Sequence, residues 1–287
     1  MSVTVGRVTA VAWPPQQALA VELARAADAA EPFPGVGPLP DRPIRLILAP
    51  SRAVFDSLTR RRLPGWSEGA AFPERGVVVL LSDRPTLRLA GALRHELAHL
   101  ALRARVRHSL PLWFEEGYAS LAAGEWDRLD ALQLNWQVAR GARFDLDELD
   151  RALRGDRPDA TTAYALATTA VLLLARWSAA GGGGGNVVAG GDRGLAPFIE
   201  HLARDPTFDA ALRDTYHITE DDFEIRWQQD VATRYGWLGW AGAVGLVWAI
   251  LGLTMIWLVR LRRRRDRARR ALLDEGWTVP SEDDPTA

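Results

Sequence analysis

The chain has 287 residues, of which 48% are hydrophobic, and a formal net charge of -1 at pH 7. This length allows one large domain or two small ones, and the near-zero net charge gives no electrostatic basis for binding nucleic acid. The chain contains no cysteine, which excludes disulfide bonds, a cysteine nucleophile and a cysteine-ligated metal site.

The first third of the sequence predicts a small mixed sheet. Apolar alternation over Val3–Trp13 indicates a strand, and the segment PQQALAVELARAADAA after it indicates an amphipathic helix. Proline and glycine residues then indicate a loop up to residue 43. Two further strands are predicted at Ile44–Pro50 and Gly76–Ser82. Because the pattern from Pro85 onward is mostly helical, we predict an α+β domain, with the sheet first and a helical half after it.

The first predicted helix of that half holds two histidines four positions apart, in RHELAHLAL. Residues i and i+4 lie on one helix face, so His95 and His99 can present two imidazoles to one metal ion. Glu96 leans toward the same side and is placed to hold a metal-bound water. Zinc lowers the pKa of such a water, and the glutamate takes its proton as nucleophilic attack begins. The sequence therefore predicts a zinc site with a general base beside it.

A third metal ligand is predicted on the next helix, in LPLWFEEGYASLAAG. A catalytic zinc needs a third protein ligand and one open coordination position, and Glu116 can supply that ligand. The alternative is that Glu115 and Glu116 mark an ordinary solvated helix start. That alternative accounts for Glu115 but does not explain a pair of glutamates in so apolar a segment.

The two motifs together, HELAH and then LPLWFEEGYA, resemble the gluzincin peptidases, most closely the bacterial peptidase MA-like domains. These share the frame H-E-x-x-H followed by W-x-x-E-G-x-A, and the resemblance covers about residues 44–235. It implies His95, His99 and Glu116 as zinc ligands and Glu96 as general base.

The aminopeptidase branch of that family adds one further expectation and one difference. There, a tyrosine that opens a later helix stabilises the oxyanion, which implies Tyr164, in TTAYALATTAVLLLARW, as the equivalent residue. The alternative for Tyr164 is a helix-packing role. The G-A-M-E-N motif of that branch is missing, and GAAFPERG stands in its place. The glutamate that holds a substrate amino terminus is thus absent, which argues against aminopeptidase activity.

The C-terminal part predicts a membrane anchor. Trp237–Val259 has no charged residue and is long enough to cross a hydrocarbon core of about 30 Å; a buried core helix is the alternative. A dense arginine block follows, and positive flanks stay cytoplasmic. We therefore expect an extracytoplasmic domain at 1–235, a single transmembrane helix at 236–260 and a basic cytoplasmic tail at 261–287.

That topology requires an export signal, but the segment MSVTVGRVTAVAWPPQ lacks a basic region followed by an apolar one. Either the true start lies upstream, or the protein is tail-anchored with its domain inside. We prefer the first explanation, because the second would move eight arginines across the bilayer.

Together these features predict a membrane-anchored zinc metallopeptidase with peptide or protein substrates, the lipid bilayer as partner of its C-terminal helix, and no nucleic acid. The strand at Gly76–Ser82 is a plausible edge for an extended substrate. One alternative is a non-catalytic membrane-tethered binding module that keeps the metallopeptidase fold. Another is a zinc hydrolase that acts on a non-peptide bond. Glu96 favours an enzyme, since a purely structural zinc site has no use for it.

Overall fold

Five strands form one mixed sheet with the order β1-β2-β3-β5-β4. The strands are β1 (Ser2–Val5), β2 (Val8–Val11), β3 (Ile44–Ala49), β4 (Gly69–Phe72) and β5 (Val77–Leu81). Parallel pairing joins β2 to β3 and β3 to β5, whereas β1 and β4 pair antiparallel to their neighbours. The computed structural model describes residues 1–60, 63–65, 67–83, 85–125, 134, 145–155, 160–181, 194–235, 248–263 and 267.

Two of the strands differ from the sequence prediction. The single strand predicted over Val3–Trp13 is a hairpin, because Gly6 adopts a positive φ of 52° and turns the chain between β1 and β2. The predicted edge at Gly76–Ser82 is wrong, since β5 lies between β3 and β4. The edge strand beside β5 is β4, which the sequence did not reveal because Gly69, Ala70 and Ala71 have weak strand propensity.

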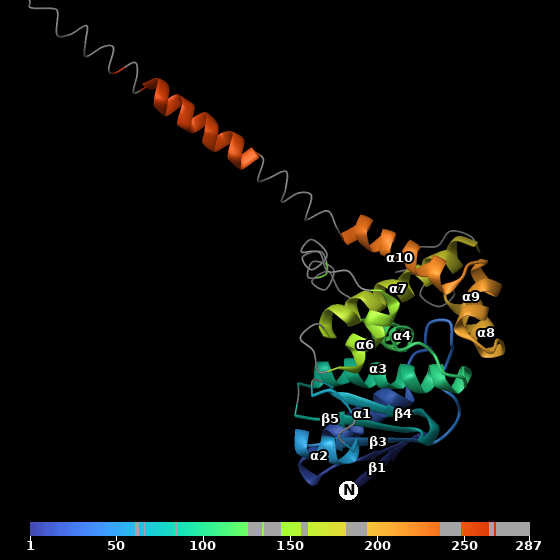
Figure 1. The fold of residues 1–287 in the computed structure, drawn as a ribbon. Coiled ribbons are helices and arrows are strands. Elements are labelled where there is room, and N and C mark those ends of the chain that lie inside the picture. Colours follow the sequence, from blue (N-terminus) through green and yellow to red (C-terminus); the bar gives the residue numbers. More distant parts are fainter. Residues whose placement is uncertain are drawn as a thin grey trace, which may run out of the picture. The chain divides into compact units, whose positions relative to one another are not determined.

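Different helices cover the two faces of the sheet (Figure 1). Successive side chains of a strand point to opposite faces. On β3, Leu46 therefore packs in the main core with α1 (Gln17–Asp28) and α3 (Thr86–Arg105). Its neighbour Ile47 points to the other face, where a smaller cluster forms around Phe55 of α2 (Arg52–Leu58). The short α2 is the cover of that second face among the described residues.

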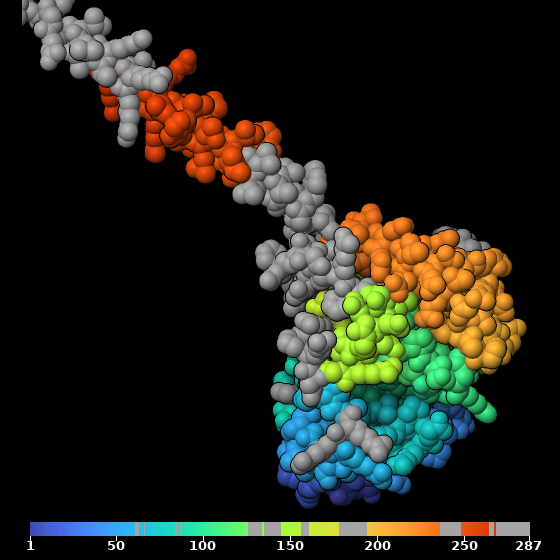
Figure 2. Space-filling model, in the orientation of Figure 1, coloured from blue at the N-terminus to red at the C-terminus, as the bar shows by residue number. Residues whose placement is uncertain are grey.

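The helical half packs on the far side of α3, and Figure 2 shows it in green to orange above the blue sheet. Within the described residues its helices are α4 (Leu112–Ala123), α6 (Leu146–Arg154), α7 (Ala160–Gly181), α8 (Ala196–Arg204), α9 (Phe208–Tyr216) and α10 (Glu220–Tyr235). Two 3-10 turns, at Pro14–Gln16 and Pro73–Arg75, complete the regular structure of the first part.

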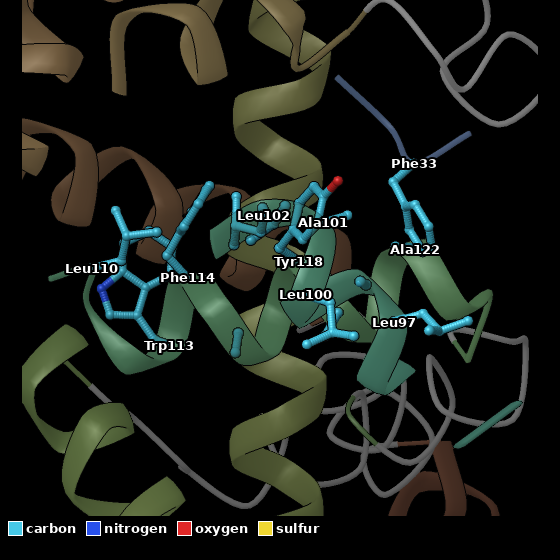
Figure 3. Close-up of a cluster of buried hydrophobic side chains, with 14 of the residues drawn as sticks. Phe33, Leu97, Leu100, Ala101, Leu102, Leu110, Trp113, Phe114, Tyr118 and Ala122 are labelled. Carbon is cyan, nitrogen blue, oxygen red and sulfur yellow. The ribbon is translucent and has the colours of Figure 1, made fainter. Parts of the chain in front are cut away.

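Helix α4 lies in the middle of this half, with apolar side chains on nearly every side. Trp113 and Phe114 pack at its beginning, and Phe33 lies near Ala122 at its end (Figure 3). The carboxylate of Asp150, on α6, accepts hydrogen bonds of 3.2 Å and 2.7 Å from the first N–H groups of α4. Such a cap satisfies helix donors that have no partner within the helix. Buried packing and this cap together fix the position of α4.

The predicted membrane span is contradicted by the structure. Within the described residues, no helix combines the length and the apolar character that crossing a bilayer requires. Residues 236–247 and most of the tail at 261–287 lie outside the described residues.

The expectations that depended on that span are corrected with it. The transmembrane helix at 236–260, the single-pass topology with an extracytoplasmic domain and a cytoplasmic tail, and the bilayer as a partner are not supported. The chain separates into two compact units, Met1–Gly236 and Trp237–Ala287. The predicted site residues all belong to the first unit.

Candidate active site

The three predicted metal ligands come together between α3 and α4. Nε2 of His95 lies 3.4 Å from one carboxylate oxygen of Glu116, and Nε2 of His99 lies 3.8 Å from the other. One ligand atom of each residue lies within 4.8 Å of those of the other two. Ligand atoms around a tetrahedral zinc ion with bonds of 2.0–2.2 Å are separated by about 3.4 Å. The spacing of the three side chains therefore fits a zinc ion.

The charge states of His99 and Glu116 also suit a cation. Burial lowers the pKa of His99 to about 4, so its imidazole is neutral and its nitrogen lone pair is open at neutral pH. Burial by itself would raise the pKa of Glu116, but the two histidines and a hydrogen bond from Tyr164 hold it at about 2. A neutral imidazole and an ionised carboxylate are the forms in which these side chains bind metals.

Glu96, the predicted base, is nearly enclosed beside the ligands. Its exposed fraction is 8%, and burial raises its pKa to about 8 although a hydrogen bond from the main-chain N–H of Ala71 opposes the rise. The side chain lies against the edge strand at Gly69. A Cβ atom at that position would lie 2.7 Å from Cγ and 2.8 Å from Cδ of Glu96, closer than real Cβ contacts occur. Glycine at this point is thus what allows Glu96 to pack against β4.

Tyr164 approaches the site from α7. Its hydroxyl donates a hydrogen bond to Glu116, and its ring centroid is 6.4 Å from that of His95. Burial and the nearby charge of Glu116 raise the pKa of Tyr164, so its phenol remains a hydrogen-bond donor. Gly117 permits the approach: a Cβ there would lie 2.6 Å from the carbonyl carbon of Ala167, one turn further along α7. Glycine after Glu116 thus lets α7 reach the metal ligands.

Glu125 is a site residue that sequence reasoning missed. Its carboxylate lies 3.2 Å from Nδ1 of His95, the ring nitrogen opposite the one that faces Glu116. Hydrogen bonds to the two glutamates outweigh burial and raise the pKa of His95. A metal-bound histidine usually donates a hydrogen bond from the N–H of its second ring nitrogen to such a carboxylate, which fixes the ring orientation. The chain reverses at Gly124, which adopts a positive φ of 69° after α4. In the sequence this glycine indicates the end of the helix, but it does not identify Glu125 as a site residue.

The neighbouring glutamate on α4 has a different partner. Glu115 accepts a hydrogen bond of 3.2 Å from Nε of Arg103, and a second N–H group of the same guanidinium contacts its other oxygen. Glu115 is therefore part of a half-buried ion pair, not the solvated helix start that the sequence allowed. The pair lies at the C-terminal end of α3, one turn beyond His99.

These residues line one cleft of about 930 Å³ between α3, the edge strand β4 and the start of α7. Among the described residues, five glutamates and two arginines line it. The main-chain N–H of Leu81 bonds to the carbonyl of Glu68, and hydrogen-bonded pairs alternate along an antiparallel ladder. The main-chain groups of Gly69 and Ala71 consequently point away from β5, toward the outer side of β4.

The remaining histidines lie elsewhere. A ring nitrogen of His108, Nε2, lies 2.7 Å from the carbonyl oxygen of Leu202 in α8, and this histidine is not among the residues that line the cleft. His201 lies near Asp205 and Asp214, and the three could in principle hold a metal. However, Nη2 of Arg204 lies 3.4 Å from the same nitrogen of His201, and this positive charge disfavours a cation.

The chain matches no protein-family model, and no curated protein is similar to it at a significant level. Support for a function consequently comes from the side chains of the site itself. The resemblance of HELAH and LPLWFEEGYA to the gluzincin motifs stays a prediction.

We expect the purified chain to hold one zinc ion through His95, His99 and Glu116. His99→Ala should lose the ion, because two ligands remain. Glu125→Ala should weaken zinc binding about 10–100-fold, as removal of an orienting partner does. Elemental analysis after dialysis and titration against a chelator measure both effects. His201→Ala is the matched control and should bind zinc like the wild type. Equal zinc content in the His99→Ala and wild-type proteins would contradict this site.

Proposed function

We propose that residues 1–235 form a zinc-dependent metallopeptidase that hydrolyses peptide bonds. The observation that supports this most is the convergence of Glu116 on the two histidines, with the buried Glu96 beside them. A purely structural zinc site has four protein ligands and no need of a base, whereas this group offers three ligands and a carboxylate. A zinc ion held there would polarise the substrate carbonyl and activate a water for attack.

Glu96 is the residue that moves the proton. Its carboxylate would accept the proton of the attacking water and deliver it to the nitrogen of the leaving amine. Such a shuttle needs a group that both takes and releases a proton near neutral pH. The burial that raises the pKa of Glu96 to about 8 brings it toward that range. A solvated glutamate, with a pKa of about 4.3, would be too weak a base for this task.

Tyr164 is proposed to stabilise the oxyanion. Its phenol is already a donor in the cleft, where it bonds to Glu116, and it lies near His95. An oxygen that gains negative charge at the metal would attract the same O–H group. The alternative is that Tyr164 only orients Glu116, and the two roles differ in what they change: turnover in the first, metal affinity in the second.

The edge strand β4 provides the surface for the substrate main chain. The main-chain N–H and C=O of Gly69 and the C=O of Ala71 point away from β5, next to Glu96, so an extended peptide can pair there as an added strand. This replaces β5 as the expected substrate edge. A polypeptide is the chemical class that such an edge recognises, which favours peptide bonds over other bonds that zinc hydrolases cleave.

We expect Glu96→Gln to keep zinc and to lose hydrolysis of a peptide library by about 10²–10⁴-fold, the usual contribution of a general base. Elemental analysis and mass spectrometry of the digested library measure the two properties on the same sample. Chelator treatment should abolish wild-type cleavage, and added zinc should restore it. Equal cleavage by the two proteins would exclude Glu96 as the base. A wild type that holds zinc and cleaves no peptide would favour a binding module or a hydrolase for another bond.

We expect Gly69→Ala to reduce turnover about a hundredfold, because the added methyl group displaces Glu96 and small misplacements of reacting groups have effects of this size. Zinc content should be unchanged, since the three atoms nearest to the added Cβ all belong to Glu96, which is not one of the three metal ligands. The control is Gly91→Ala on α3, where a Cβ meets nothing within 4 Å. Equal kcat in both alanine variants would show that Glu96 tolerates the methyl group.

We expect Tyr164→Phe to lower kcat by about 10²–10³-fold with little change in KM, the signature of a donor that acts in the transition state. The ring and its packing are retained, so the thermal unfolding temperature should stay close to that of the wild type. Zinc affinity is measured in parallel. A weaker zinc affinity with unchanged kcat at saturating zinc would instead identify Tyr164 as a residue that orients Glu116.

A further inference from the structure

A second hollow lies on the sheet face opposite α3, and its floor is apolar. Here α2 ends at Leu58, and no other helix of the described residues covers the neighbouring part of β3, β4 and β5. A groove of about 570 Å³ results, with Ile47, Phe72 and Val77 as half-buried residues of its floor. Leu58, at its side, is 39% exposed. Sheet faces with apolar side chains are normally covered, so this surface is suited to a ligand.

The rim of this groove is basic. Arg45, Arg60 and Arg75 line it and are exposed, against a single carboxylate, Glu74. In the part of the chain that the structure describes, none of these arginines is in an ion pair. The arginines that line the catalytic cleft differ in this respect, because each is paired with a glutamate. We call the second hollow, with these three residues on its rim, the arginine groove.

The arginine groove adjoins the cleft along the end of β4. Thr59, Ala71, Phe72 and Pro73 line both hollows. Alternate residues of β4 face opposite sides of the sheet, so Ala71 faces the cleft side while Phe72 belongs to the groove floor. An extended chain advances about 3.3 Å per residue. A substrate bound along β4 can therefore reach the groove within a few residues of the edge.

We propose that the arginine groove binds an acidic segment of the polypeptide substrate, a few residues away from the scissile bond. This inference rests on the proposed peptidase function and adds a substrate preference to it. Carboxylates of the segment would pair with the three arginines, whose planar guanidinium groups suit such partners. Apolar side chains of the same segment would cover Ile47 and Val77. Acidic and apolar residues together in one segment are what this surface recognises.

Binding is tested first, without turnover. A fluorescent peptide with alternating glutamate and leucine residues is titrated into zinc-loaded Glu96→Gln protein, and anisotropy is recorded. The same peptide with glutamine for each glutamate is the neutral control. We expect the acidic peptide to bind at least about tenfold more tightly, with an affinity that falls as salt is raised. A variant that also carries Arg45→Gln, Arg60→Gln and Arg75→Gln should lose this preference.

A second triple variant separates local binding from net charge. Arg25, Arg105 and Arg151 are exposed and line neither hollow, so their replacement by glutamine changes the net charge equally. This control should keep the preference for the acidic peptide. Equal loss in both triple variants would overturn the proposal. Tighter binding of anionic lipid vesicles than of the acidic peptide, dependent on the groove arginines, would also overturn it.

Cleavage is then compared with Glu96 intact. For a substrate extended by the acidic segment, the groove variant should show about a tenfold lower kcat/KM, whereas the value for the neutral extension should be unchanged. If the wild type and the groove variant cleave the acidic substrate with equal kcat/KM, the proposed role of the groove is contradicted, whereas the proposed peptidase function is not. Arginine-dependent binding of the acidic peptide, with no cleavage of any peptide by the wild type, contradicts the proposed function instead.

Discussion

Glu116 crosses from α4 to α3, where its two oxygens lie 3.4 Å and 3.8 Å from Nε2 of His95 and of His99. The arrangement of the first unit around the site depends on this contact. Three buried or nearly buried polar side chains meet within a few ångströms, and the carboxylate of Glu116 would be costly to bury without the two histidines. The surrounding helices hold them there: Asp150 caps α4, and Gly117 allows α7 to pack closely behind Glu116.

The polar site stands inside an otherwise apolar body, which gives its residues unusual proton affinities. Glu96 and Glu116 are the same residue type within one cleft, yet burial raises the pKa of the first to about 8, while two histidines and Tyr164 lower that of the second to about 2. Two carboxyl groups with such different proton affinities suit two different roles, a proton carrier and a metal ligand. A stable fold without function would have no reason to bury either.

One edge strand of the sheet lines the candidate site, and one face of the sheet is only partly covered. Its α3 side is covered by α1 and α3, and the catalytic cleft lies along β4. The other side has the short α2, and three unpaired arginines surround the apolar floor beside it within the described residues. Because β4 borders both hollows, a single extended ligand can meet an acidic cleft and a basic groove in succession. Charge would then contribute to the register of the ligand as well as to its affinity.

The sequence by itself determined the elements that local patterns encode. The four-residue spacing of His95 and His99 predicted their common helix face, because helical periodicity is local, and the apolar setting of Glu116 predicted that it was more than a solvated residue. An uncharged run also suggested a membrane helix at 236–260. That prediction was wrong for the described residues: the absence of charge in a segment does not establish a helix of sufficient length.

Tertiary structure decided what depends on residues far apart in the chain. Only the fold brings Glu125 to Nδ1 of His95, since 30 residues separate them and a lone glutamate after a helix has no distinctive pattern. Strand order makes β4 an edge strand, and the sequence does not reveal that order. The small residues Gly69 and Ala71 resemble a loop in the sequence, and only the structure shows Glu96 packed against this strand. The arginine groove likewise exists because α2 is too short to cover β3 and β5. Pairing between distant segments, which no local pattern encodes, fixed each of these features.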